Sequence, residues 1–311
     1  MEESTKLELE ASQPESLLVP PSRARASTSR ALADIHVGNN ARSASHWALY
    51  ASHRARLAEV LSAHAGRRLA ILGAGNGNDL ELEALTRTFR EVHLGDLDGA
   101  ALDRAARRLT PAARKRVRLH RGRDLSGLLP VLPAWREHAP TPVELAGAVP
   151  FAAALVASRL PGPFDLVVSD CLLSQISWTC YQALSGGELL TSVLYVALAS
   201  HLRALLSLTK PGGRCLLVTD AVSSDTVPLD ESEGRHAGDE RSALLRHLDA
   251  EGRLFSGTSP TLALSLLTTD PVLSREVVDP FVVEPWVWRL EPRRSVLVYA
   301  LSFARRASRD A

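Results

Sequence analysis

Short apolar runs alternate with segments of helical periodicity along most of the chain. The apolar runs are rich in aliphatic residues, and they cover residues 68–75, 91–98, 116–120, 164–170 and 213–220. The segments that carry apolar side chains at helical spacing cover residues 79–89, 100–109 and 189–208. Because strands separated by helices pair in parallel, this order predicts a parallel sheet covered by helices on both faces.

The end of the chain departs from this alternation. Residues 284–290 and 295–306 have the pattern of two strands, and only "EPRR" separates them. A connection this short permits only an antiparallel pair. We therefore expect an α/β fold whose mostly parallel sheet closes with a C-terminal antiparallel pair.

The start of the chain has a different character from the rest. Residues 1–30 are rich in serine, proline and charge and show no apolar period, which predicts a flexible tail. Residues 31–66 are expected to form a helical cap, with a helix of about four turns starting near residue 45. The main domain would then cover residues 67–311.

Two stretches interrupt the alternation within this main domain. Residues 125–163 are punctuated by proline, and residues 225–257 combine an acidic loop with a helical segment. Both are interpreted as insertions. An insertion of this length either builds a lid over a site or adds surface packing.

Composition narrows the class of protein. The chain has 311 residues, of which 45% are hydrophobic, and a formal net charge of +1. It can therefore bury a sizeable core, and no overall charge draws it to nucleic acid or to a membrane. Its three cysteines form no CxxC pair, which is typical of reduced thiols. Apolar runs such as 189–202 stop short of the roughly 18 residues that span a bilayer, so we expect a cytoplasmic protein without a membrane partner.

Candidate chemistry begins at the loop that follows the first predicted strand. Its glycines are Gly73, Gly75 and Gly77, and Asn78 stands where a dinucleotide-binding loop has its third glycine. No Gly-Lys-Ser or Gly-Lys-Thr follows, so a phosphate-binding loop of that type is disfavoured as well. A glycine turn between a strand and a helix still lets backbone amides approach a ligand closely.

The G-x-G-x-G spacing resembles motif I of the class I S-adenosylmethionine-dependent methyltransferases. The resemblance continues in "HLGDLD", where Asp96 ends the second strand, and in "FDLVVSDCLLSQ", where Asp170 ends the fourth. It implies a Rossmann-like, doubly wound sheet of seven strands and S-adenosyl-L-methionine as the cofactor. In that family the acid after strand two binds both ribose hydroxyls, and an acid after strand three lies near the adenine amine. The cofactor residues implied are Gly73, Gly75, Asn76, Gly77, Asp96, Leu97, Asp124, Leu125 and Asp170.

The chain departs from the family at one cofactor contact. Many members carry an acid two positions before the first glycine, where this sequence has Ile71. Asn76, Asn78 or Asp79 are the candidates to replace that contact at the methionine end. An alternative for Asp96 is that it caps the helix that follows it, and an alternative for Asp124 is that it caps its own loop.

The predicted N-terminal helix offers further candidates. Trp47, Tyr50 and Arg54 fall on one face of that helix. Since family members often close an N-terminal helix over the cofactor, Tyr50 and Arg54 are assigned to cofactor binding. The alternative is an aromatic stripe that packs on the domain, with Arg54 solvated.

The acceptor site is expected in the segment that follows the fourth strand. Gln175, Trp178 and Tyr181 lie there and are assigned to substrate binding, with helix packing as the alternative. Asp170 is assigned the catalytic task of orienting the acceptor or the amino group of the cofactor. No spacing of histidine, cysteine and acid suggests a metal.

Together these residues predict transfer of a methyl group to oxygen or nitrogen of a small molecule, with specialised metabolism as one setting. An RNA methyltransferase is the second hypothesis, supported only by the six basic residues within residues 113–123. A non-catalytic binding module with the same fold is the third. The sequence leaves the acceptor and the oligomeric state open.

Overall fold

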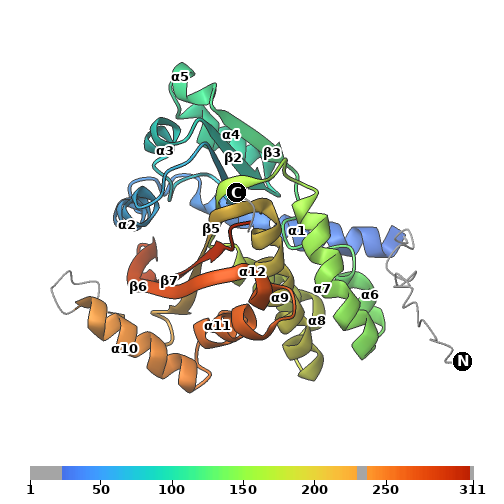
Figure 1. Cartoon of the computed structure of the whole chain (residues 1–311). Helices are drawn as coiled ribbons and strands as arrows, with labels where there is room; N and C mark the ends of the chain where they lie inside the picture. The colour runs from blue at the N-terminus through green and yellow to red at the C-terminus, as the bar shows by residue number, and fades with distance from the viewer. Residues whose placement is uncertain (1–22, 230–236, 309–311) are drawn as a thin grey trace, which may run out of the picture.

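A computed structural model describes residues 23–229 and 237–308 of the chain. Seven strands form one sheet in the order β3-β2-β1-β4-β5-β7-β6 (Figure 1). The strands are β1 Arg68–Leu72, β2 Glu91–Asp96, β3 Val117–Arg121, β4 Phe164–Asp170, β5 Thr209–Ser223, β6 Val277–Glu291 and β7 Arg294–Arg305. The first five strands run parallel, and β7 pairs antiparallel with both β5 and β6. The predicted sheet and its closing pair are therefore confirmed.

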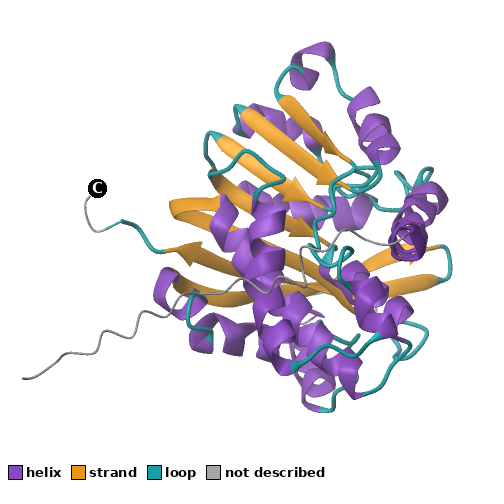
Figure 2. Ribbon diagram, turned by 90° about the vertical axis from the view of Figure 1, so that its right-hand side faces the viewer, coloured by secondary structure: helices purple, strands orange, loops and turns teal. Residues whose placement is uncertain are grey.

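Helices cover both faces of the sheet (Figure 2). One face packs against α2 Ala51–Ser62, α3 Leu82–Thr88 and α4 Gly99–Arg107. The other packs against α6 Leu132–Glu137, α7 Pro142–Ala157, α8 Leu173–Leu184, α9 Glu188–Leu208 and α11 Pro260–Thr269. The remaining helices are α1 Arg23–Ser43, α5 Pro111–Arg114, α10 Ala237–Ala250 and α12 Leu273–Glu276. The central strands are buried on both faces, which explains their continuous apolar runs.

The N-terminal region differs from the prediction. Helix α1 begins at Arg23, so the boundary predicted at residue 30 falls inside a helix, while residues 1–22 lie outside the described part of the chain. Helix α2 begins at Ala51 rather than near residue 45, and turns precede it. Polar contacts hold α1 in place, including a hydrogen bond from Ser29 Oγ to the carbonyl oxygen of Leu129 at 2.9 Å. Because polar contacts hold this helix, its sequence does not need an apolar stripe and shows no apolar period.

Both insertions contain helices. Residues 125–163 include α6 and α7, and α7 starts with a capping box in which Thr141 and Glu144 each accept from the other's backbone N–H. Residues 225–257 include α10, although residues 230–236 lie outside the described ranges. Helix α7 packs on α9 and so thickens one helical layer.

Helix α9 is longer than the apolar run that was expected to fall short of a bilayer. It has 21 residues, and within the described ranges it alone is long and apolar enough to cross a membrane. However, 72% of its apolar window is buried inside the protein. Its apolar surface is accounted for by packing between α7, the sheet and α11.

Helix α9 also buries a histidine whose protonation should couple to stability. His201 is 2% exposed, and its Nε2 lies 2.8 Å from Ser169 Oγ. Burial lowers the pKa of His201 to about 4. The unfolded chain therefore takes up a proton near pH 6.5 that the folded protein does not accept until about pH 4, and stability is lost as the pH falls through this window.

We expect the stability advantage of the wild type over His201→Gln to shrink by about 2 kcal/mol between pH 8 and pH 5. Urea unfolding at the two pH values measures this difference. His247 is 63% exposed on its side chain, and His247→Gln is the matched control that should show no such change. A constant difference for His201→Gln at both pH values would show that this imidazole does not titrate between the folded and unfolded states as described.

Candidate functional site

The glycine loop folds over the carboxyl ends of β1 and β2. Gly73, Gly75 and Gly77 all have positive φ, at 83°, 46° and 58°. A side chain on Gly73 would place its Cβ 2.9 Å from Leu172 Cβ, and one on Gly75 would place it 2.9 Å from Asn40 Oδ1. Glycine is therefore required here for backbone conformation and for space.

Asp96 lies directly beneath this loop. Its Oδ2 accepts the backbone N–H of Gly75 at 2.8 Å, and its Oδ1 accepts that of Asp98 at 2.8 Å. The Asn40 amide also donates to Oδ1, at 3.4 Å. The residue is 8% exposed, and burial raises the pKa of its carboxyl. The backbone thus fixes a carboxylate at the end of β2, where the resemblance implies the ribose diol.

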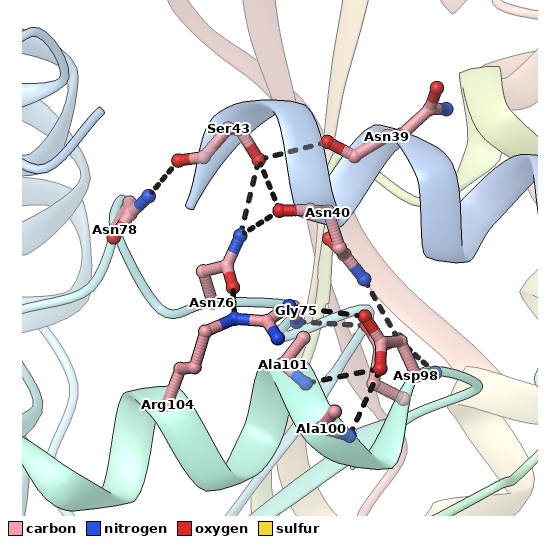
Figure 3. Close-up of polar contacts among 11 residues, drawn as sticks. Asn39, Asn40, Ser43, Gly75, Asn76, Asn78, Asp98, Ala100, Ala101 and Arg104 are labelled. Carbon is pink, nitrogen blue, oxygen red and sulfur yellow. Dashed lines mark hydrogen bonds and ion pairs between the residues drawn. The ribbon is translucent and has the colours of Figure 1, made fainter. Parts of the chain in front are cut away.

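The alternative role of Asp96 as a helix cap is wrong. Asp98 is the N-cap of α4, because its Oδ1 accepts the backbone N–H groups of Ala100 at 2.9 Å and Ala101 at 3.1 Å (Figure 3). Asp96 makes neither contact. Its carboxylate is therefore not needed to start the helix.

A cavity opens beside Asp96, between the ends of β1, β2 and β3 and helices α1 and α8. Leu97 and Leu125 line it with aliphatic surface, and Asp124 lies at its edge. Oδ1 of Asp124 accepts from the backbone N–H and hydroxyl of Ser126, at 2.9 and 2.6 Å. Its buried Oδ2 has no hydrogen-bond partner among the described residues. The loop-capping alternative therefore accounts for one oxygen of Asp124 and leaves the other free to accept from a ligand.

Asp170 lies beside the glycine loop, but its side chain does not line this cavity. It is 1% exposed, and within the described part of the chain neither of its oxygens has a hydrogen-bond donor. Burial, followed by the neighbouring carboxyl of Asp79, raises the pKa of Asp170 well above its usual range. Burial also raises the pKa of Asp79, to about 6. Two carboxyls therefore meet here, and the guanidinium groups of Arg108 and Arg54 lower the pKa of Asp79 against the effect of burial.

The side chains of His53, Asp170 and Cys171 also approach one another. Their potential ligand atoms all lie within 4.8 Å, as in a metal site. However, Trp286 Nε1 donates to His53 Nδ1 at 2.9 Å, so the neutral imidazole carries its proton on Nε2. A histidine ligand has the opposite arrangement, with its second nitrogen as a donor. The cluster does not suit a metal, and burial lowers the pKa of His53 to about 3.

Asn76 is turned away from the cavity. Its amide donates to the carbonyl oxygen of Asn40 at 2.7 Å and to Ser43 Oγ at 3.2 Å (Figure 3). Its Oδ1 accepts from Arg104 Nε at 2.7 Å. The Asn78 amide similarly donates to the carbonyl oxygen of Ser43 at 2.6 Å. Both asparagines therefore cap the end of α1, and neither side chain faces the cavity.

Tyr50 and Arg54 also lie outside the cavity. The Tyr50 ring packs edge-on against Trp288 at 4.8 Å. Arg54 donates to Glu81 Oε1 at 2.7 Å and to the carbonyl oxygens of Trp47 and Asn78 at 2.8 and 2.7 Å. Its guanidinium lies 3.7 Å from the centre of the Trp47 ring. The packing alternative describes Tyr50. Its solvated Arg54 is wrong, because Arg54 is 7% exposed and supports the glycine loop from behind.

The structure brings one of the three predicted acceptor residues to the cavity. Gln175 lines it, whereas Trp178 and Tyr181 stack on each other at 5.4 Å and are 49% and 45% exposed. The phase of α8 explains this outcome. Its buried stripe is formed by Leu173, Ile176, Cys180 and Ala183. Helical spacing of this stripe already places the two aromatic residues on the outer face.

Sequence reasoning missed the contribution of α1. His36 lines the cavity, with Nδ1 3.1 Å from Gln175 Oε1 and Nε2 2.7 Å from Thr179 Oγ1. Asn40 reaches Asp96 from the same helix. The segment was assigned partly to the tail because it has no apolar stripe. Its only helical signal is a content of alanine and arginine, which are good helix formers.

No protein-family profile and no curated protein matches this chain. Solved structures resemble it at low identity. The YcgJ protein from Bacillus subtilis is 12% identical with a TM-score of 0.40, and the match covers 83% of this chain and 99% of that one. N-methyltransferase NodS from Bradyrhizobium japonicum WM9, in complex with S-adenosyl-L-homocysteine, is 13% identical with a TM-score of 0.39 over 82% and 86% of the two chains. TrmN from Thermus thermophilus is 15% identical with a TM-score of 0.40 over 81% and 48%.

These scores identify neither a substrate nor a reaction for this chain, and the fold follows from its own topology. Five parallel strands are closed by a C-terminal antiparallel pair, as the resemblance implied, and β7 lies between β5 and β6. This is the class I methyltransferase fold. Within the methyltransferase fold, the glycine loop and Asp96 lie at the carboxyl edge of the sheet, where open α/β sheets bind ligands.

Proposed function

We propose that the protein is an S-adenosylmethionine-dependent methyltransferase that acts on oxygen or nitrogen of a small molecule. The observation that supports it best is the arrangement of Asp96 and Asp124 around the cavity. A buried carboxylate suits a ribose diol, because it accepts hydrogen bonds from both hydroxyls. Leu97 and Leu125 offer apolar surface to a flat base, and the free Oδ2 of Asp124 can accept from an exocyclic amine. An adenosine group matches all three features.

The acidic pair of Asp79 and Asp170 supports the same proposal at the methionine end. Asp79 interacts electrostatically with both Asp96 and Asp170, so the three carboxyls lie near one another beside the glycine loop. Arg108 and Arg54 interact with Asp79, whereas the buried oxygens of Asp170 have no donor among the described residues, so an ammonium group beside Asp170 would stabilise its ionised form. We therefore assign to this pair the ammonium contact that Ile71 cannot make.

The chemistry requires little from the protein beyond alignment. The bound cofactor supplies an activated methyl group on a sulfonium. The chain would hold the acceptor in line with that group, and alignment of this kind contributes up to about 7 to 11 kcal/mol. Gln175, which lines the cavity from α8, is the polar group assigned to orient an acceptor.

The basic cluster in residues 113–123 does not favour an RNA substrate. Arg114 and Arg116 donate to the backbone carbonyls of Ala106 and Thr86, each at 2.7 Å. Arg121 pairs with Asp103 at 2.6 Å. These side chains hold the edge of the sheet, so they are not free to converge on phosphates.

We expect calorimetric titration to show binding of S-adenosylmethionine and no binding of NAD, because the glycine loop lacks the third glycine of a dinucleotide site. Transfer of a labelled methyl group into small molecules rather than RNA, each incubated separately with the protein, then tests the acceptor class. Micromolar binding of NAD without binding of S-adenosylmethionine would overturn the proposal. Cofactor binding with labelling of RNA alone would retain the reaction and overturn the acceptor class.

A further inference from the structure

Helix α1 lies over the site that would hold the adenosine group, and it is held there by polar contacts. Among residues 25–43, Leu32 alone is buried. The last carbonyl groups of a helix need outside donors, and the amides of Asn76 and Asn78 supply two of them, at the carbonyl oxygens of Asn40 and Ser43. An element with so little apolar burial opens at low free-energy cost.

The side chain of Asn40 occupies an acceptor position that a ribose would need. An ionised carboxylate accepts about four hydrogen bonds. The backbone N–H groups of Gly75 and Asp98 use two positions on Asp96, and the Asn40 amide uses a third. One position remains, whereas the two hydroxyls of a diol need two. Asn40 Oδ1 also lies within 2.9 Å of where a Cβ on Gly75 would be, so it fills the space above the loop.

The volume of the cavity also indicates that α1 obstructs the site a ribose would need. It measures about 30 Å³, whereas sites for small molecules usually measure about 300 to 1,000 Å³. His36 forms one wall through its contacts with Gln175 and Thr179 on α8. Asn40 and His36 therefore attach α1 to two different elements, Asn40 to Asp96 at the end of β2 and His36 to α8.

We propose that α1 is a displaceable gate over the cofactor site and that Asn40 is the latch that competes with the ribose for Asp96. This inference rests on the proposed function. The state described here is the closed one. Cofactor enters when α1 moves away, so the affinity measured for the wild type is reduced by the fraction of molecules that are closed.

The gate predicts that Asn40→Ala binds S-adenosyl-L-homocysteine more tightly than the wild type, by about threefold to tenfold, because the closed state loses a hydrogen bond to a charged group. The substitution leaves the backbone carbonyl of residue 40, and hence the contact with Asn76, in place. Asn39→Ala is the matched control, since the side chain of Asn39 contacts only Arg42 of the same helix among the described residues. Its affinity should equal that of the wild type.

A second variant and a hydrogen-exchange measurement test the movement of α1 independently of Asn40. His36→Ala removes the contacts of α1 with Gln175 and Thr179 on α8 and should also tighten binding. Hydrogen exchange of the amides in residues 30–43 of the wild type should become faster when S-adenosyl-L-homocysteine is added.

Weaker binding by Asn40→Ala, or slower exchange in α1 on adding the ligand, would overturn the gate and identify α1 as part of the binding site. Equal binding by Asn40→Ala and the wild type would overturn the role of Asn40 as a latch. Absence of binding by the wild type and by both variants would instead overturn the proposed function.

Discussion

Asp96→Ala is expected to weaken binding of S-adenosylmethionine by about 2 to 4 kcal/mol, or roughly 30-fold to 1,000-fold. The substitution removes the acceptor of both ribose hydroxyls and leaves the diol without a partner. Titration calorimetry measures the change directly. The effect should exceed that of any other single carboxylate at the site, because Asp96 is expected to accept both hydroxyls and is held in place by the backbone N–H groups of Gly75 and Asp98.

The backbone contacts of Asp96 also determine which control variants are needed. Since Asp96 also accepts from Gly75, the alanine variant loosens the loop, and Asp96→Asn, which keeps one acceptor oxygen, should give an intermediate loss. Asp103→Ala removes an exposed carboxylate of α4 and should leave affinity unchanged. Thermal unfolding of each variant separates loss of binding from loss of fold. If a folded Asp96→Ala protein bound the cofactor as tightly as the wild type, Asp96 could not be the diol site.

Asp170→Asn is expected to stabilise the fold while it weakens binding of the cofactor. At pH 8 the wild type must either hold a charge on Asp170 in a buried site or keep the carboxyl protonated, and both are unfavourable. Removing this cost should raise the free energy of unfolding by about 1 to 3 kcal/mol. The same change removes a charged partner of the ammonium group, which should weaken cofactor binding by about 1.5 to 3 kcal/mol.

The sign of the pH dependence follows from the raised pKa. A carboxyl whose pKa is higher in the folded state binds its proton more tightly there, so its cost is absent at low pH and appears as the pH rises above about 4. The stability gained by Asp170→Asn should therefore be larger at pH 8 than at pH 5 in urea unfolding. Asp103→Asn, on the surface, should show no gain at pH 8. A less stable Asp170→Asn protein at pH 8 would show that the buried carboxyl has a partner that stabilises it.

Much of the architecture could be predicted from local pattern. The alternation of apolar runs with helical segments was enough to predict the parallel strands. The short connection "EPRR" was enough to predict the antiparallel pair. Asp96 was predicted as a site residue from the resemblance, in which an acid ends the second strand, and the structure has it at the end of β2. The outer position of Trp178 and Tyr181 was also available in the sequence, since the buried stripe of α8 has regular helical spacing.

By itself, the sequence determined the strands, the helices between them, the type of sheet and the glycine loop, because local periodicity and glycine spacing encode them. Only the tertiary structure decided what covers the site. Asn40 meets Asp96 across 56 positions of the chain, in a helix without an apolar stripe, so no local pattern predicts the contact. The hydrogen bond from Trp286 to His53 likewise joins residues that are 233 positions apart. A polar side chain finds a partner, or is left without one, according to how distant segments pack, and that packing has no period along the chain.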